Sequence, residues 1–140
     1  MSPREVAIEI ADRYDTNNPF EIARERDIRI LYASMKTTFG FYVRYHRTQN
    51  IILNDALSDW MQQFVCAHEL GHSILHADLN VPKLTRYTMF SRDKFEMQAN
   101  TFAVELLLPD GFLREYADCS IYQLARSVGV PEEFIDLKQL

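Results

Sequence analysis

Apolar residues recur at intervals of three and four near the start of the chain, over residues 3–14. Val6, Ile10 and Tyr14 would share one face of a helix at this spacing. Ser2 and Pro3 occupy the positions where a side-chain cap and a first-turn proline are common. After a break at residues 16–18, a shorter helix is predicted over residues 19–26. The chain is therefore expected to begin with two helices.

The hydrophobic period then shortens to about two residues. Ile28, Ile30 and Tyr32 alternate along a first predicted strand, and the aromatic segment 39–46 predicts a second. A third strand is expected at residues 51–53, after a hairpin turn at 47–50. Three successive strands with short links favour a small three-stranded antiparallel sheet arranged as a meander.

This strand region also has an unusual charge pattern. It contains no acidic residue from position 28 to position 54, whereas Arg29, Lys36, Arg44 and Arg47 give it a charge of +4. The default interpretation is a solvated strand face. The alternative is an edge strand beside an active site that pairs with an extended substrate.

Helical spacing returns in the second half of the chain. A broad apolar surface predicts a largely buried helix over residues 57–77, capped by Ser58 or Asp59. An irregular segment, 78–92, separates it from a second long helix at 92–108, and loops of this length often carry function. Shorter helical segments are expected at 110–116, 120–128 and from 131 onward. The elements together predict an α+β fold, with the sheet packed on a mainly helical core.

Composition narrows the class of protein. The 140 residues are 47% hydrophobic, which suits one compact domain spanning residues 1–140. The net charge of −5 disfavours a protein that works by direct binding to nucleic acid. No signal peptide is evident, no apolar run approaches a membrane span, and Cys66 and Cys119 make no disulfide framework. We therefore expect a cytoplasmic protein with no membrane partner, in which Cys66 is a buried structural thiol and Cys119 is more exposed.

The long helix at 57–77 contains the sequence His-Glu-Leu-Gly-His at residues 68–72. On a helix, His68 and His72 lie one above the other on one face, close enough to share a metal ion. Glu69 lies beside that face and can reach a metal-bound water without binding the metal. This arrangement is typical of zinc-dependent peptide hydrolases.

A catalytic zinc site needs a third protein ligand. His76 continues the four-residue rhythm, but it lies about 12 Å along the helix axis from His68, too far for one ion to join both. A supporting or helix-end role suits His76 better. Glu96, on the second long helix, is the stronger candidate for the third ligand.

The neighbours of Glu96 in the sequence allow two interpretations of its role. Asn100 follows it by four residues on the same helix face, where its side-chain oxygen could accept a hydrogen bond from a ligand histidine. The alternative is that Glu96 belongs to a charged outer face with Arg92 and Lys94.

The HExxH motif, followed by ExxANxFAxxLLxP at residues 96–109, closely resembles the signature of the ImmA/IrrE metallopeptidases. Residues 18–23 and 130–135 resemble segments of the same family. The resemblance implies a zincin-like helical core and a gluzincin-like site, with His68, His72 and Glu96 as ligands and Glu69 as catalytic base. It implies one Zn²⁺ per chain, with Mn²⁺ or another divalent ion as alternatives.

The same resemblance implies a partner. Members of this family cut helix-turn-helix repressors of phages, mobile elements or stress operons, so such a repressor is the expected substrate. Some longer relatives carry a C-terminal sensory domain, for which this sequence has no room, so we expect no built-in sensing. A metal-bound protein that sequesters a repressor without cutting it is the main alternative.

A second donor to the substrate oxyanion is usual in such enzymes. Tyr87 is the first choice from the sequence, ahead of Tyr42, Tyr45 and His76.

The C-terminal segment, residues 121–140, offers another alternative function because it resembles a DNA-binding helix-turn-helix. Its second helix would carry Glu132, Glu133 and Asp136 against Lys138, a net charge of −2 that DNA phosphates would repel. Helix packing, or a docking surface for a repressor, is the better interpretation.

Overall fold

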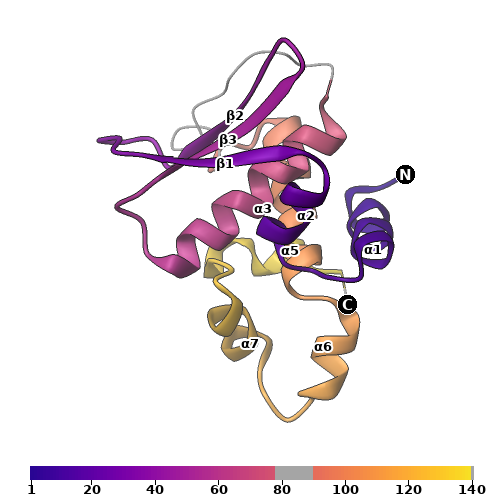
Figure 1. The fold of residues 1–140 in the computed structure, drawn as a ribbon. Helices are drawn as coiled ribbons and strands as arrows, with labels where there is room; N and C mark the ends of the chain where they lie inside the picture. Colours follow the sequence, from indigo (N-terminus) through magenta and orange to yellow (C-terminus); the bar gives the residue numbers. More distant parts are fainter. Residues whose placement is uncertain (78–89, 140) are drawn as a thin grey trace.

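The computed structural model describes residues 1–77 and 90–139 and shows an α+β fold, as predicted (Figure 1). The elements are α1 (Pro3–Tyr14), α2 (Pro19–Glu25), β1 (Ile28–Ala33), β2 (Gly40–Tyr45), β3 (Thr48–Asn54), α3 (Asp59–Leu75), α5 (Lys94–Leu107), α6 (Asp110–Glu115), α7 (Ile121–Val128) and the 3₁₀ helix η1 (Glu132–Leu137). The three strands form one sheet, and the described helices gather mainly below it in the view of Figure 1.

Side-chain caps fix where several helices begin. The Ser2 hydroxyl accepts a hydrogen bond from the Glu5 amide at the start of α1. Ser58 caps α3 in the same way through the Met61 amide. The Gln62 side chain adds a hydrogen bond at this end of the helix by donating to the carbonyl of Leu57.

The sheet is mixed, so the predicted antiparallel meander is wrong for its first strand. The strand order is β1-β3-β2, with β1 parallel to β3 and β2 antiparallel to β3. Residues 34–39 do not form a hairpin link but pass across the end of β3. Asn54, the last residue of β3, donates from Nδ2 to the carbonyls of Met35 (2.5 Å) and Thr38 (3.0 Å). These bonds hold the crossing link, and β3 takes the central position.

The hairpin between β2 and β3 is tighter than predicted. Its turn consists of His46 and Arg47, and β3 already begins at Thr48. His46 has a positive φ of 56°, a conformation that tight two-residue hairpin turns require.

The inner face of the sheet packs on α3. Ile51 and Leu53 of β3 are fully buried. At Gly40 of β2, an added Cβ would lie 2.8 Å from the carbonyl oxygen of Ile52 and 3.0 Å from Cγ1 of Val65 on α3. The strand therefore passes close enough to α3 that only glycine fits at this point.

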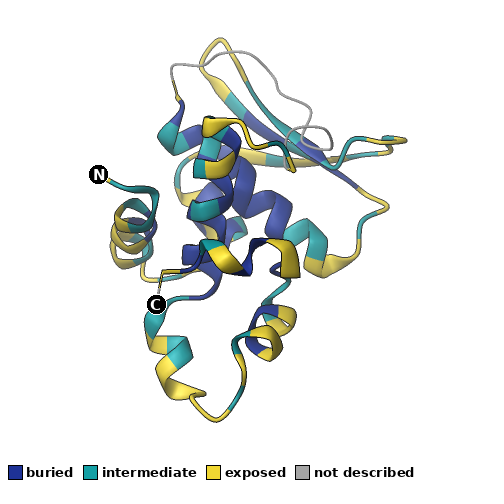
Figure 2. Cartoon of the chain, turned by 180° about the vertical axis from the view of Figure 1, so that it is seen from behind, coloured by how far each residue is buried: buried dark blue, intermediate teal, exposed yellow. Residues whose placement is uncertain are grey.

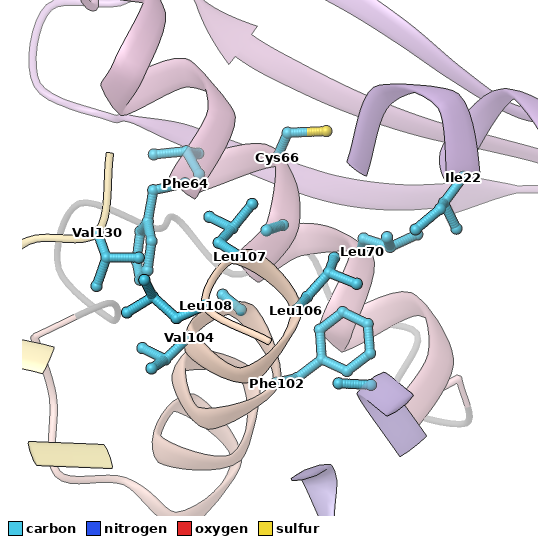
Figure 3. Close-up of a cluster of buried hydrophobic side chains, with 14 of the residues drawn as sticks. Ile22, Phe64, Cys66, Leu70, Phe102, Val104, Leu106, Leu107, Leu108 and Val130 are labelled. Atoms are coloured by element: carbon cyan, nitrogen blue, oxygen red, sulfur yellow. The ribbon is translucent and has the colours of Figure 1, made fainter. Parts of the chain in front are cut away.

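The core lies between α3 and α5, which form the dark blue centre of Figure 2. Figure 3 shows side chains of the two helices interleaving, with Phe64 and Leu70 from α3 and Phe102 and Leu106 from α5. At Gly71 an added Cβ would lie 3.0 Å from Cδ1 of Phe102. The glycine inside the HExxH motif thus permits the close approach of α5 to α3.

A charged cluster joins the chain ends to α5. Arg4 of α1 contacts Glu105 of α5 (2.7 Å) and Asp110 of α6 (2.6 Å). Lys138, whose side chain is fully buried, contacts the same two carboxylates at 2.7 Å each. We call these four residues the terminal ion cluster. The described part of the chain contains no helix with both the length and the apolar character to cross a membrane.

Candidate metal centre

Two helices bring the predicted ligand residues together. His68 and His72 lie on consecutive turns of α3, with ring centroids 4.7 Å apart. Their Nε2 atoms converge on one carboxylate oxygen of α5, Glu96 Oε1, at 3.1 and 2.9 Å. One potential ligand atom from each of the three residues lies within 4.8 Å of the others.

The opposite ring nitrogens of both histidines also have partners. Nδ1 of His68 lies 2.7 Å from Oδ1 of Asn100, one turn after Glu96 on α5. Nδ1 of His72 lies 2.9 Å from Nδ1 of His76. Both rings are therefore fixed in orientation, with Nε2 directed at the shared carboxylate.

Glu96 is buried, with 1% of its surface exposed, so it does not belong to a charged outer face. Burial alone would raise the pKa of its carboxyl. Hydrogen bonds from the His68 and His72 rings, and their charge, outweigh burial and hold the pKa of Glu96 below its usual range. The carboxyl group is therefore ionised at neutral pH, which is the form that binds a metal.

The donor set fits a divalent metal ion. Imidazole nitrogens and a carboxylate are the ligands of catalytic zinc sites. Two ligands at roughly 2.0–2.1 Å from a tetrahedral ion are about 3.4 Å apart. The Nε2–Oε1 separations of 2.9 and 3.1 Å come close to this value before any adjustment of the side chains. Residues His68, His72 and Glu96 can thus hold one ion.

Glu69 lies beside this donor set. Its side chain is buried, and Oε2 is 4.0 Å from Nε2 of His68. This separation is longer than the contacts among the three ligand candidates, and it places a carboxylate next to the position that a metal would occupy. A carboxylate in this place can exchange a proton with a water molecule bound there.

His76 lies next to the ligand set rather than within it. The residue caps the C-terminus of α3 and directs Nδ1 at His72 and Nε2 at Gln98 Oε1, 2.8 Å away. Tyr87, the first choice for an oxyanion donor, lies outside the described residues. Tyr42, another choice, donates its hydroxyl hydrogen to Gln49 Oε1 at 2.8 Å on the sheet.

Gln98 is a site residue that the sequence did not single out. It lies between Glu96 and Asn100 in the chain, but two residues along a helix from each, so it does not share their face. Phe95 lies three residues before Gln98 and contacts the same histidine, with its ring centroid 4.8 Å from that of His76. The i, i+3 spacing of Phe95 and Gln98, adjacent to the ligand face, was the available signal.

The C-terminal segment does not form the helix pair of a DNA-binding motif. Its second part is η1, a 3₁₀ helix of six residues. Phe134 of η1 is buried and stacks on Phe64 of α3 at a centroid distance of 5.4 Å. The segment serves to pack against the helix that carries the metal ligands, as the sequence favoured.

Comparison with known proteins shows the family to which the chain belongs. Residues 23–138 match the family model described as the IrrE N-terminal-like domain, of peptidase family M78. The chain is 40% identical over 131 residues to "Uncharacterized immunity region protein 2" of Bacillus phage phi105, an alignment covering 91% of this chain and 83% of the phage protein. It is 35% identical over 129 residues to "Metallopeptidase ImmA" of Bacillus subtilis strain 168, covering 89% and 76% of the two chains. The chain belongs to the ImmA/IrrE family of metallopeptidases.

Proposed function

We propose that this chain is a zinc-dependent endopeptidase of the gluzincin type that hydrolyses one specific peptide bond in a helix-turn-helix repressor. The observation that carries the proposal is the convergence of His68 Nε2 and His72 Nε2 on Glu96 Oε1, with the Glu69 carboxylate 4.0 Å from the first of them. Two fixed nitrogen ligands, one carboxylate ligand and a neighbouring base make up a metallopeptidase site.

Each residue has a defined role in this reaction. His68, His72 and Glu96 would hold the ion, and Asn100 keeps the ring of His68 in place through Nδ1. Zinc, when bound, supplies Lewis acidity that polarises the peptide carbonyl and makes water a stronger acid. Glu69 takes a proton from the attacking water and returns it to the leaving amine.

The choice of substrate rests on the relatives. The phage relative carries the words "immunity region" in its name, and the ImmA/IrrE resemblance implies a repressor as the target. A repressor encoded beside this chain is the substrate to test. Direct DNA binding is not part of this proposal, because η1 buries Phe134 against Phe64 of α3 and exposes acidic residues that DNA phosphates would repel.

The test incubates the purified chain with that repressor and zinc, with and without a chelator, and analyses the products by mass spectrometry. We expect a single cut that the chelator abolishes. Glu69→Gln should lower the cleavage rate by roughly 10²–10⁴-fold, because the base is lost, while zinc affinity stays near that of the parent chain.

Two outcomes would contradict the proposal. If Glu69→Gln bound zinc and cut at the full rate, Glu69 would not be the base. If the repressor stayed intact in a tight, zinc-dependent complex, the chain would act by sequestration instead of cleavage.

A further inference from the structure

A line of three polar side chains leads from α5 to one of the ligand histidines. Gln98 Oε1 lies 2.8 Å from Nε2 of His76, and Nδ1 of His76 lies 2.9 Å from Nδ1 of His72. The far nitrogen of His72, Nε2, faces Glu96 and the position of the ion. We call Gln98, His76 and His72 the α5-to-ligand chain.

The positions of the hydrogen atoms along the α5-to-ligand chain follow from the amide oxygen of Gln98 at its end. An amide oxygen only accepts a hydrogen bond, so His76 must donate to Gln98 from Nε2–H. A neutral imidazole carries one proton, so Nδ1 of His76 has a lone pair and accepts from Nδ1–H of His72. With Nδ1 of His72 donating to His76, Nε2 is the nitrogen that can give up the proton it shares with Glu96 and bind a metal through its lone pair.

The opposite orientation of the Gln98 amide gives the opposite result. If the amide nitrogen donated to His76 Nε2, His76 would donate from Nδ1, and His72 would keep its proton on Nε2. That nitrogen could then bind a metal only if the ring lost its last proton, which is unfavourable. With its oxygen toward His76, as in this structure, Gln98 favours Nε2 of His72 as the nitrogen that binds a metal.

Packing holds the side chains of the α5-to-ligand chain in this arrangement. His76 is buried, and its backbone N–H donates a hydrogen bond to the carbonyl of His72 at the end of α3. The ring of Phe95 packs against the His76 ring, with the two centroids 4.8 Å apart. Phe95 and Gln98 share one face of α5, while Glu96 and Asn100 share the neighbouring face. Helix α5 therefore supplies one ligand and also supports both ligand histidines, His68 directly through Asn100 and His72 through His76.

We propose that Gln98 is a positioning residue for the metal, because its side-chain oxygen, acting through His76, keeps Nδ1 of His72 as the hydrogen-bond donor and Nε2 as the nitrogen directed at the ion. This inference rests on the metal site of the proposed function but not on its substrate. Partners that orient a ligand in this way typically change metal affinity by about 10–100-fold when they are removed.

The test measures zinc affinity by competition with a chromophoric chelator, together with the melting temperature of the zinc-free chain. Gln98→Met keeps the length of the side chain and removes the acceptor, so zinc affinity should fall roughly 10-fold or more. Gln98→Glu keeps an acceptor oxygen at the same place and should restore affinity to within about 3-fold of the parent, well inside that 10-fold window.

A matched control comes from another partly buried glutamine. Gln63 of α3 donates to the carbonyl of Val128 at 2.9 Å, away from the ligands. Gln63→Met should lower the melting temperature of the zinc-free chain at least as much as Gln98→Met does, and it should leave zinc affinity unchanged.

Parental zinc affinity in a folded Gln98→Met would overturn the inference, as would an equal loss in Gln98→Glu, because the acceptor would then not be the cause. Zinc affinity is measured without a repressor. An absence of cleavage would therefore contradict the proposed peptidase reaction while leaving this test of Gln98 intact.

Discussion

Each ligand histidine uses its two ring nitrogens for different purposes. In both rings Nε2 faces Glu96, whereas Nδ1 contacts a supporting side chain, Asn100 for His68 and His76 for His72. Because these supports are part of the folded protein, the rings are oriented before an ion arrives. Binding then requires little loss of side-chain freedom, which favours affinity.

The two cysteines allow a prediction at the scale of single residues. Burial, with a smaller contribution from the charge of Glu69, raises the pKa of the Cys66 thiol well above its usual range, and the residue has no exposed surface. Cys119 is partly exposed. Iodoacetamide at pH 8 should therefore label Cys119 at least roughly 100-fold faster than Cys66 in the folded chain, as measured by peptide mass spectrometry.

Unfolding in urea provides the control, since both thiols should then react at similar rates. Labelling of Cys66 in the folded chain at the rate of Cys119 would show that the core around α3 opens readily.

The sequence predicted the residues of the centre that follow helical spacing. His68 and His72 at i, i+4, and Glu96 and Asn100 at i, i+4, each had to share a helix face, and the structure brings these two faces together. For Gln98 the i, i+3 spacing with Phe95 indicated only a shared helix face, because its role depends on where the end of α3 places His76 relative to α5. That placement is a matter of tertiary packing.

At the scale of elements, the metal centre depends on how closely α5 approaches α3. Gly71 lies where Phe102 of α5 meets α3, and an added Cβ would lie 3.0 Å from the Phe102 ring and 3.3 Å from its Cβ. Phe102 is fully buried and has little room to move. The position of Glu96 relative to the histidines follows from this contact.

Gly71→Ala should accordingly lower the free energy of unfolding by about 1–3 kcal/mol, through overpacking. It should also weaken zinc binding, because α5 must move away from the ligands on α3. Urea denaturation and chelator competition measure the two effects.

Gly111→Ala is the matched control. This glycine lies in α6, where the nearest atom to an added Cβ is Nη2 of Arg114 at 3.9 Å. The substitution should leave stability unchanged or raise it by up to roughly 1 kcal/mol, because alanine favours a helix. Equal changes in stability at the two glycines would mean that helix propensity, rather than the α3–α5 contact, determines the effect of Gly71→Ala.

Helices and strands differed in how well the sequence predicted them. Helix ends were predicted to within a few residues, because caps such as Ser2 and Ser120 and the apolar period act locally. The order of the strands was not predicted, because it depends on hydrogen bonds from Asn54 to the link between β1 and β2, which lies far from Asn54 in the sequence. Strand spacing alone does not contain that information.

At the scale of the whole molecule, the terminal ion cluster connects both ends of the chain to α5. Glu105 accepts contacts from Arg4, Lys138 and the backbone amide of Gln139, while Asp110 contacts the same two cations. Glu105 lies on the helix that carries Glu96, so the cluster anchors α5 at the end opposite to the metal ligand.

This cluster should make stability depend on acid pH. The Arg4 guanidinium, and then Lys138, hold the pKa of Asp110 well below its usual value of about 3.9. A carboxylate with a lowered folded-state pKa stabilises the fold above its unfolded pKa, and this contribution is lost as pH falls toward the folded pKa. Asp110→Asn should therefore cost about 1 kcal/mol near pH 7, the scale of a partly exposed ion pair, and the difference should shrink below about pH 4.

Urea midpoints of the parent chain and the variant between pH 3 and pH 7 measure this dependence. Asp136→Asn, at an exposed position of η1, is the control and should give a difference that stays small at every pH. A deficit for Asp110→Asn that remained constant down to pH 3 would contradict the ionic explanation.

The strand order has a consequence for the way the sheet assembles. Strands β2 and β3 are joined by the two-residue turn at His46 and can pair within microseconds once both exist. In the described chain β1 pairs with β3 alone, the strand synthesised last, so β1 has no partner until β3 exists. We therefore expect closure of this parallel, non-local pair to be slower than formation of the hairpin. Until it occurs, an apolar strand with unpaired backbone groups is open to association with the wrong chain.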